Sequence, residues 1–368
     1  MLGAGPAGAA CARALARAGV RRIALIDAGR SVAAIGETIP PDACLLLDRL
    51  GLWTAFLAEG HERCLGSCSA WGSAVLGFND FILNPHGAGW HLDRACFDDF
   101  LRRRAEEAGA IRLQSARLTG AEANGEGGYD LRLATSSGEV GLRASFVVDA
   151  TGRASAFARR VGARQAPLDR LTFVYGFFDS TGARSHSRLT LLEAVEDGWW
   201  YAAKLPGGRM AVAIATDAER VRQDGLAGDG RWLRAALATR HLAPQLDGCR
   251  FLAGCLTARV AATFRLDRAT GARWIAIGDA ASVFDPLAAQ GMHKALADGL
   301  DGAALVAKAL AHGGDLGPEH DRTLDARFEE YLVNRDHFYD LERRWPASEF
   351  WCRRQAGRAF AATTRMSA

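Results

Sequence analysis

Short apolar runs alternate with helical stretches at both ends of the chain. Residues 22–26 form an apolar run of strand length, and a stretch rich in Ala and Arg, residues 9–18, precedes it. Residues 145–149 and 273–277 form two further short apolar runs, and we expect a long helix over residues 293–311. This alternation is typical of an α/β fold with buried strands.

The middle of the chain has the pattern of antiparallel strands. Four strands are predicted over residues 171–178, 189–195, 199–205 and 210–216. The turn signals Glu196-Asp197-Gly198 and Pro206-Gly207-Gly208 separate the last three strands. We expect this sheet to form a second domain, with residues 60–92 folded beside it. In the tail, apolar residues at helical spacing predict a helix docked on a core: Phe328, Tyr331, Leu332, Phe338, Tyr339 and Leu341.

A nucleotide-binding motif stands at the first turn. In Gly3-Ala4-Gly5-Pro6-Ala7-Gly8, the first glycine permits a tight turn, the second lets backbone approach a pyrophosphate, and the third lets the helix pack on the strand. The helix start adds unpaired N–H groups that suit phosphate. Asp27 ends the second strand, where a carboxylate can bind ribose hydroxyls. Only Met1 and Leu2 precede Gly3, so the first strand is unusually short or begins upstream.

Composition narrows the class of protein. The chain has 368 residues, 49% hydrophobic and 24% charged, which suits two globular domains or one large α/β domain that carries an insertion. The net charge is +3 without a block of like charge, so no nucleic-acid partner is expected. Eight cysteines lack metal-ligand spacing and predict reduced thiols. No 18-residue apolar run predicts a membrane span, and a chain that opens inside the motif leaves no room for a signal peptide, so we expect a cytoplasmic location.

Three ordered motifs resemble the flavoprotein hydroxylases of the para-hydroxybenzoate hydroxylase fold. They are Asp149-Ala150-Thr151-Gly152, Gly278-Asp279 and the segment from Asp285-Pro286 to Gln290-Gly291-Met292. The resemblance implies FAD in a Rossmann-like domain of the glutathione reductase type, with Asp279 on the ribityl chain. It also implies a helix start at the pyrimidine edge of the flavin, where negative charge develops.

The predicted FAD-binding domain is discontinuous and comprises residues 1–52, 93–165 and 270–315. The substrate domain takes residues 53–92 and 166–269, and residues 316–368 form a C-terminal helical segment. The residues expected to bind FAD are Gly3, Gly5, Pro6, Ala7, Gly8, Asp27, Glu37, Arg94, Asp149, Gly152, Asp279, Pro286, Gln290, Gly291 and Met292.

Within this group the chain is similar to the tryptophan-halogenase-like branch. Gly36-Glu37-Thr38-Ile39-Pro40 resembles a segment that implies a flavin-adjacent role for Glu37, our one candidate catalytic side chain. The Asp93-Arg94 segment resembles one whose Arg approaches the FAD phosphates. Aromatic and imidazole side chains on the sheet side either line a substrate pocket or pack in the core; the pocket candidates are Trp71, Trp90, His91 and Trp200.

Halogenases of this branch need a lysine in their first hundred residues. Here only Lys204, Lys294 and Lys308 occur, beside 42 Arg, and guanidinium is no usable amine nucleophile. The halogenase Trp-x-Trp-x-Ile-Pro signature is also changed. The resemblance therefore implies hydroxylation through a flavin C4a-hydroperoxide, with NAD(P)H as reductant.

The end of the chain, from Glu342 to Arg354, is similar to that of the flavoprotein maturases of tryptophylquinone enzymes, namely quinohemoprotein amine dehydrogenases and quinone-dependent amino-acid oxidases. This similarity implies a partner polypeptide whose tryptophan side chain is the substrate, and an Arg-rich rim would suit an acidic partner. The alternatives are a small-aromatic hydroxylase of a natural-product pathway, a halogenase, a reductase of the geranylgeranyl-reductase type and a flavin-bound assembly chaperone.

Overall fold

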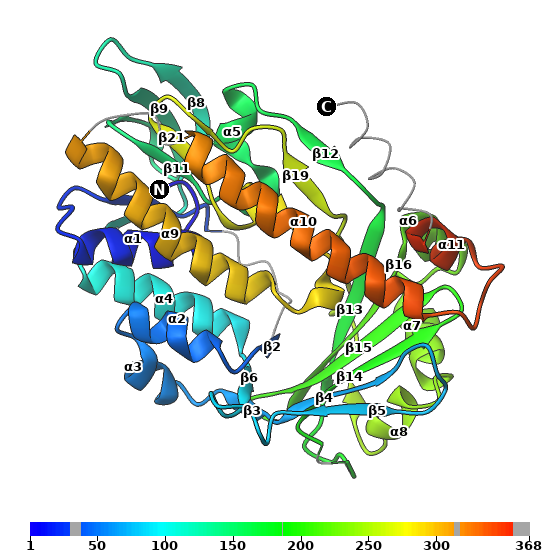
Figure 1. Ribbon diagram of the computed structural model, residues 1–368. Helices are drawn as coiled ribbons and strands as arrows, with labels where there is room; N and C mark the ends of the chain where they lie inside the picture. Colours follow the sequence, from blue (N-terminus) through cyan, green and yellow to red (C-terminus); the bar gives the residue numbers. More distant parts are fainter. Residues whose placement is uncertain (30–37, 186, 313–316, 356–368) are drawn as a thin grey trace.

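The computed structural model describes residues 1–29, 38–185, 187–312 and 317–355 (Figure 1). Among these residues no helix is both long and apolar enough to cross a membrane. The chain has an α/β fold in which a short parallel sheet with helices lies beside a larger, mostly antiparallel sheet, and C-terminal helices join the two.

The parallel sheet is built from segments that are far apart in sequence. In spatial order it contains β7 (Ile111–Leu113), β1 (Ala24–Ile26), Leu2, β11 (Val147–Asp149), β21 (Trp274–Ala276) and the antiparallel β20 (Thr270–Gly271). Leu2 bridges both Ile26 and Asp149, and its amide donates to the Val148 carbonyl at 2.9 Å. The two residues before the first glycine therefore hold the central position of the sheet.

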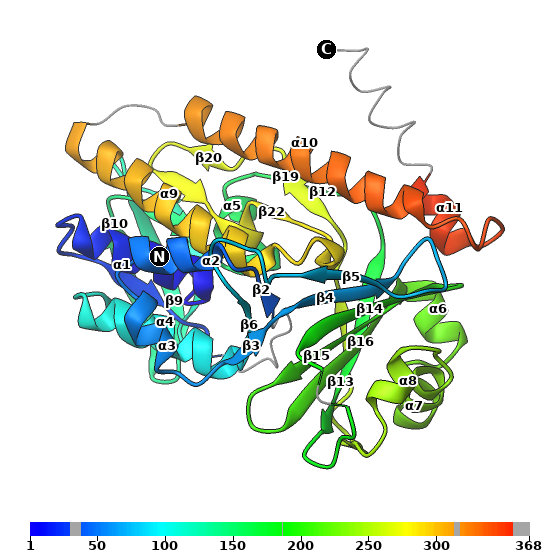
Figure 2. The ribbon, with the colours of Figure 1, turned by 60° about the horizontal axis from the view of Figure 1, so that its bottom comes forward.

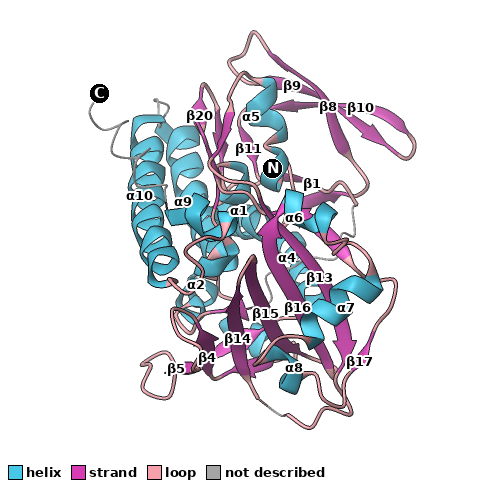
Figure 3. Cartoon of the chain, turned by 90° about the vertical axis from the view of Figure 1, so that its right-hand side faces the viewer, coloured by secondary structure: helices cyan, strands magenta, loops and turns pink. Residues whose placement is uncertain are grey.

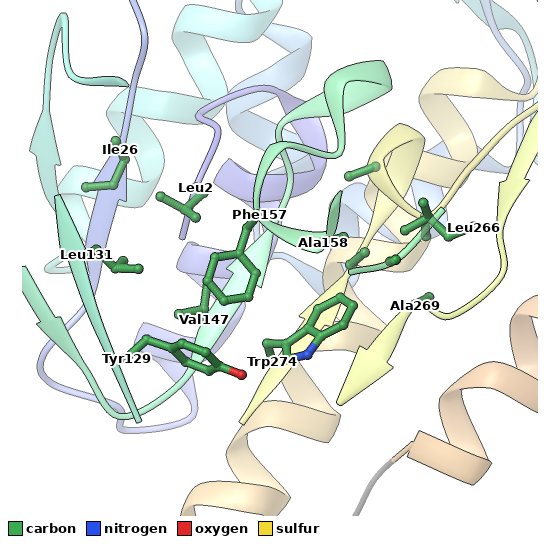
Figure 4. Close-up of a cluster of buried hydrophobic side chains, with 14 of the residues drawn as sticks. Leu2, Ile26, Tyr129, Leu131, Val147, Phe157, Ala158, Leu266, Ala269 and Trp274 are labelled. Carbon is green, nitrogen blue, oxygen red and sulfur yellow. The ribbon is translucent and has the colours of Figure 1, made fainter. Parts of the chain in front are cut away.

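Neighbouring residues of these strands face opposite layers. Leu25, Val148 and Ile275 pack against α1 (Pro6–Arg17), α4 (Arg94–Glu107) and α9 (Gly291–His312). Their neighbours Ile26, Val147 and Trp274 pack on the other side against Tyr129 and Leu131 of β9 and against α5 (Figure 4). That side is formed by β8 (Arg117–Ala123), β9 (Tyr129–Thr135), β10 (Gly138–Ala144) and α5 (Ala156–Arg160).

The larger sheet has eight strands. Its path is β17 (Arg250–Phe251), β13 (Leu171–Asp179), β16 (Arg209–Asp217), β15 (Gly198–Leu205), β14 (Leu189–Val195), β4 (Gly66–Ala70) and β5 (Gly77–Asp80), and β18 (Thr257–Val260) also pairs with β13. The four predicted strands are confirmed almost residue for residue and pair antiparallel. β4 pairs parallel to β14, so the complete sheet is mixed rather than antiparallel throughout.

Helices cover both faces of this sheet. On one face lie α6 (Ala218–Gln223), α7 (Asp229–Leu237) and α8 (Leu242–Gln245), as Figure 3 shows. On the other face lie α11 (Glu349–Gln355) and the C-terminal end of α10 (Gly317–Leu341). Figure 2 shows α10 running from α9 to α11, so a single helix spans both halves of the molecule.

Short strands and helices complete the fold. One small sheet has the order β2 (Thr38–Ile39), β6 (Gly89–His91) and β3 (Glu62–Cys64), and another has β12 (Gln165–Pro167), β19 (Phe264–Leu266) and β22 (Ser282–Val283). Helices α2 (Ala43–Arg49) and α3 (Trp53–Leu57) pack near the start of α4. The predicted residues 60–92 thus do fold beside the sheet, because β4 and β5 belong to it.

Candidate functional site

The three glycines of the first turn have different surroundings. A Cβ on Gly3, whose φ is +104°, would lie 2.1 Å from the Ala150 carbonyl oxygen, and one on Gly8 would lie 2.0 Å from the Gly3 oxygen. A Cβ on Gly5 would meet no atom of the described residues within 4 Å. Packing therefore requires the first and third glycines, whereas the second leaves open space at the start of α1, where a pyrophosphate can approach backbone.

Asp27 is placed at the end of β1 as predicted, but it already has partners. Its Oδ2 accepts from Arg112 Nε at 3.0 Å and from the Arg112 terminal nitrogen at 2.7 Å, and its Oδ1 accepts from the Gly29 amide. Arg112 lies on β7, directly beside β1. Sequence reasoning missed this ion pair, because the pairing of β1 with β7 carries no local signal. A ribose contact at Asp27 stays a prediction.

Asp149 holds a loop and has no oxygen left for a ligand. Its Oδ1 accepts from the Thr151 amide and hydroxyl at 3.0 and 2.6 Å, and its Oδ2 accepts from the amides of Phe157 and Ala158 at 2.9 and 2.8 Å. The side chain is fully buried. The predicted contact between Asp149 and FAD is therefore replaced by an indirect role, in which the carboxylate fixes the turn at Gly152.

Asp279 is the carboxylate that remains available. It follows Gly278, whose φ is +59° and whose Cβ position would lie 2.8 Å from Ala7, so this turn abuts the start of α1. Asp279 is exposed and has no hydrogen-bond or ion-pair partner among the described residues. The protein around it nevertheless raises the pKa of its carboxyl by desolvation, against the opposing charges of Lys294, Arg153 and Arg94. The Asp279 side chain is therefore accessible to solvent, although much of the space around its carboxyl group is protein.

Arg94 begins α4 and belongs to the same neighbourhood. Its charge acts on Asp279, and its guanidinium pairs with Asp98 at 3.3 Å. The Arg94 side chain is mostly buried. The structure thus brings together Arg94 and Asp279, two residues 185 positions apart that the sequence assigned to one ligand.

A buried ion pair behind the Gly278 turn escaped sequence reasoning. Lys294 Nζ donates to the Gly278 carbonyl oxygen at 2.8 Å and to Asp298 Oδ2 at 2.9 Å. The same Asp298 oxygen accepts from the Gly278 amide at 3.1 Å. Both side chains come from α9 and are buried. The pair holds the two polar atoms of Gly278 and so fixes the backbone that presents Asp279.

The segment before α9 is exposed where the resemblance places the flavin. Pro286, Gln290 and Gly291 are exposed, whereas Met292 is buried in the core between α2, α4 and α9. Helices α1 and α9 pack closely, because Gly299 leaves room for the Ala7 carbonyl oxygen, which would lie 2.8 Å from a Cβ there. Lys294, in the first turn of α9, bonds the Gly278 carbonyl oxygen, and Gly278 abuts Ala7 at the start of α1, so the first turns of the two helices and the Asp279 turn belong to one region.

The four predicted pocket residues do not lie together. Trp200 is wrong as a pocket residue: it points to the face of the sheet covered by α7, where its ring lies 5.4 Å from that of Trp232. Strand alternation fixes that Trp199 and Trp200 face opposite ways, but not which face meets the cofactor. Trp90 packs on Phe56, in the cluster between α2, α3 and α4, with ring centroids 5.3 Å apart. This packing replaces the predicted place in a pocket.

His91 is also a buried structural residue. It is fully enclosed, and its Nε2 lies 3.0 Å from the Thr190 hydroxyl of β14. Burial lowers the pKa of the imidazole to about 4, so the ring is neutral near pH 7. Trp71 is half-buried on the α10 side of the sheet, and its Nε1 donates to the Phe338 carbonyl at 2.6 Å.

The sheet face covered by α10, α11 and the turn before α9 carries another of the aromatic side chains of β15. Tyr201, half-buried on β15, forms a hydrogen bond of 2.9 Å with the Thr38 hydroxyl, and Leu287 from the turn before α9 belongs to the same apolar cluster. Thr38 directly follows Glu37. Glu37, the candidate catalytic side chain, lies outside the described residues, so its role stays a prediction.

The arrangement fits a dinucleotide with an anionic pyrophosphate and a hydroxylated chain. Open backbone at Gly5, the two helix starts and the unpartnered Asp279 supply the donors, positive dipole ends and acceptor that such a molecule needs. Together, the fold and this site define an FAD-dependent flavoprotein enzyme. Residues 1–317 match the FAD binding domain family, and the chain belongs to that family.

Known proteins similar to the chain include oxygenases and halogenases. The putative FAD-dependent oxidoreductase LodB of Marinomonas mediterranea is 28% identical over 363 residues, which cover 97% of this chain and 96% of LodB. The flavin-dependent halogenase armH4 of Armillaria mellea is 27% identical over 84% of this chain and 65% of its own length. Among solved structures, the flavin-dependent halogenase CmlS has a TM-score of 0.85 at 23% identity, covering 96% of this chain and 66% of CmlS. The peptidyl tryptophan dihydroxylase QhpG has a TM-score of 0.75 at 25% identity, covering 96% and 77%.

Proposed function

We propose that this chain is an FAD-dependent monooxygenase that hydroxylates a tryptophan side chain of a partner polypeptide during tryptophylquinone cofactor biogenesis. One atom of O2 replaces a ring hydrogen as a hydroxyl, the other leaves as water, and NAD(P)H supplies the two electrons, directly or through a separate flavin reductase. Support comes from the similarity to LodB over nearly the whole of both chains and to QhpG, a peptidyl tryptophan dihydroxylase.

The positions of the three lysines favour hydroxylation over halogenation. No lysine precedes Lys204, although the resemblance implies that a halogenase needs one there. Lys204 lies four residues after Trp200 on β15, so the two side chains point to the same face of the sheet. This face lies opposite Tyr201 and the proposed cofactor side. Lys294 is buried against Asp298, and Lys308 pairs with Glu319 at 3.2 Å. None of the three ammonium groups is therefore in place to intercept an oxidant.

The residues of this chain have defined tasks in such a reaction. Bound FAD supplies the activation of O2. The starts of α1 and α9 and the Asp279 carboxylate bind and orient the cofactor. The face of β15 that carries Tyr201 covers the reacting region and limits the access of water. A reactive flavin needs this exclusion of water while an aromatic ring is held beside it.

An exposed apolar segment supports a macromolecular partner. Between β4 and β6, Val75, Phe78, Ile82 and Leu83 are 71%, 66%, 88% and 91% exposed. β5 is the edge of the sheet and is exposed along its length. The segment leads directly into β6, the strand paired with Thr38. Such apolar exposure is uncommon on a monomer, and edge strands accept extended chains, so a polypeptide of apolar, extended character suits this surface.

The test is an oxygenation assay read by mass spectrometry. The protein loaded with FAD is incubated with NAD(P)H, a flavin reductase, ¹⁸O2 and candidate tryptophan-containing polypeptides. We expect one or two ¹⁸O atoms on a tryptophan of one polypeptide, and a lower yield of this product from the Asp279→Ala variant when FAD is limiting. Label only on free indoles or phenols would replace the proposal by small-aromatic hydroxylation. Reduction of FAD without any oxygenated product would contradict both.

Halogenation is the second candidate, because the fold is shared with the halogenases CmlS and CndH at TM-scores of 0.85 and 0.84. The same assay with chloride and bromide decides between them. A halogenated product that forms in place of the oxygenated one would overturn the hydroxylase proposal. We expect no halogen incorporation, and unchanged yield of hydroxylated product when the salt is replaced by sulfate.

A further inference from the structure

We infer that Tyr331 and Tyr339 of α10 are positioning residues for the flavin, because they hold the turn at Asp285 that leads into the start of α9. The inference rests on FAD binding, which the family shows, and it deepens the proposed function by naming residues beyond residues 1–317 that prepare the cofactor site. It holds whichever substrate the enzyme oxidises.

Tyr331 holds the backbone where the turn begins. The Asp285 amide donates to the Tyr331 hydroxyl at 2.7 Å, and the Tyr331 ring stacks on that of Phe284 with centroids 4.1 Å apart and planes 3° from parallel. Because an amide can only donate, the hydroxyl accepts here; it also forms a hydrogen bond of 3.0 Å with Thr263 Oγ1, in which either hydroxyl can donate. Tyr331 thus fixes two successive residues at the beginning of the turn.

Tyr339 holds the side chain of the same aspartate. Its hydroxyl lies 2.8 Å from Asp285 Oδ2, and Trp199 Nε1 lies 3.2 Å from that hydroxyl. Since the indole nitrogen is only a donor, Tyr339 must accept from Trp199 and donate to the carboxylate. Asp285 Oδ1 accepts from the Leu287 amide at 2.9 Å, which closes the turn. The chain of bonds therefore runs from β15 through α10 to the turn.

The surroundings make these bonds costly to lose. Asp285, Tyr331 and Tyr339 are all buried, at 2%, 3% and 0% exposure. Burial raises the pKa of Asp285, and the Leu287 amide, the Tyr339 hydroxyl and the Arg354 charge oppose that rise. Among the described residues, removal of the Tyr339 hydroxyl leaves the buried carboxylate with one hydrogen bond, and removal of the Tyr331 hydroxyl leaves the buried Asp285 amide without an acceptor.

The two tyrosines are eight positions apart and so share one face of α10. The turn they hold continues through the exposed Pro286 and Gln290 to the first N–H groups of α9. Those groups are the ones that the site directs at the flavin. A turn released from Asp285 would present this helix start in several positions, so the clamp preorganises the cofactor side of the site.

The experiment compares Tyr331→Phe and Tyr339→Phe with a matched control, Tyr129→Phe. Each variant keeps its ring, and Tyr129 also uses its hydroxyl in one part-buried hydrogen bond, to the Ala272 carbonyl at 2.9 Å, away from the Asp285 turn. Hydrogen exchange of the segment 284–292 is measured on the FAD-free protein. The dissociation constant, visible spectrum and reduction potential of bound FAD are then measured on the loaded protein.

We expect the Tyr331 and Tyr339 variants to exchange about ten- to hundredfold faster in this segment, the factor for loss of one hydrogen bond to a charged or buried group. We expect weaker FAD binding and a shifted spectrum and potential in both. The control should lose stability alone. If all three variants lower the unfolding midpoint alike while exchange, FAD affinity and potential stay at wild-type values, the tyrosines are merely structural and the inference is wrong. Loss of tryptophan oxygenation plays no part in this decision.

Discussion

Replacing Asp149 by Asn tests the account of the second turn most sharply. The substitution keeps the shape of the side chain but turns one acceptor oxygen into an NH2 donor. In the native structure each carboxylate oxygen accepts from at least one backbone amide, Oδ1 from Thr151 and Oδ2 from Phe157 and Ala158. No orientation of the amide group can therefore satisfy all of these donors.

The geometry sets the size of the effect. The better orientation points the new nitrogen toward Thr151, whose hydroxyl can rotate to accept, and leaves the Thr151 amide unpaired at a cost of about 1–3 kcal/mol. Weakening of the two remaining bonds, which lose their charged acceptor, adds about 1 kcal/mol. Desolvation raises the pKa of Asp149, so removal of the buried charge recovers part of this loss. We expect a net loss of about 1–3 kcal/mol in the free energy of unfolding.

The measurement is denaturant unfolding of the FAD-free protein followed by tryptophan fluorescence. Asp130→Asn is the matched control, because Asp130 is half exposed and pairs with the exposed Arg143 at 3.1 Å, an arrangement that contributes less than about 1 kcal/mol. The Asp149 variant should also bind FAD more weakly, since the Gly152 turn loses its support. Stability of Asp149→Asn within about 0.5 kcal/mol of wild type would refute the reasoning, because surface substitutions already produce that much.

Three further predictions follow from the site. Asp279→Ala should weaken FAD binding about tenfold or more, as loss of a hydrogen bond to a charged group does, with little change in the unfolding midpoint; isothermal titration checks this, and equal affinity would exclude Asp279 as a ligand. Gly299→Ala should cost about 1–3 kcal/mol and weaken FAD binding, because its Cβ would lie 2.8 Å from the Ala7 oxygen and push α9 from α1; a variant as stable as wild type would contradict the close packing. The His91 pKa of about 4 lies below that of an unfolded histidine, so its contribution to stability is complete above about pH 6.5 and lost as pH falls toward 4, by at most about 1.4 kcal/mol per unit. Unfolding of wild type and His91→Gln from pH 4 to 7 should show this difference in slope, and parallel curves would assign a different proton to the effect.

Sequence reasoning succeeded where the signal is local. The four strands from Leu171 to Asp217 were predicted almost to the residue, since alternation and turn residues are contained within each hairpin. The roles of Gly3 and Gly8 were likewise readable, because each glycine serves its own strand–helix turn. Asp279 was assigned to the ribityl chain by a resemblance; its carboxylate is exposed, and the contact with FAD stays a prediction.

Contacts with a residue from a distant segment could not be predicted from the sequence. The Arg112 side chain on Asp27 depends on strand pairing, and the Lys294–Asp298 pair matters only because α9 passes behind Gly278. Trp200 was misplaced because alternation leaves the choice of face open. None of these facts has a period or a spacing that a single sequence displays.

The Arg-rich end of the chain is the clearest correction. It was expected to form a rim for an acidic partner, but its described arginines are largely used within the protein. Arg354 is buried and pairs with Asp217 at 2.8 Å, Arg353 also contacts Asp217, and Arg344 pairs with Glu342. These bonds tie α11 and the end of α10 to the sheet, so the described charges that they use stabilise the tail.

The interleaved order of the parallel sheet has a consequence for how the protein is made. Its adjacent strands come from residues 1–2, 24–26, 147–149 and 274–276, so the central sheet closes only after residues 274–276 have left the ribosome. The hairpins between Leu189 and Asp217 need only contacts nearby in sequence and can form much earlier. During synthesis the turn at Gly3 to Gly8 therefore lacks its neighbouring strands at first. Its apolar neighbours stay uncovered until the strand that ends beside Asp279 has been made. Capture of flavin is then a late event in biogenesis, and a nascent chain halted before residue 274 should be a target for chaperones rather than a holder of the cofactor.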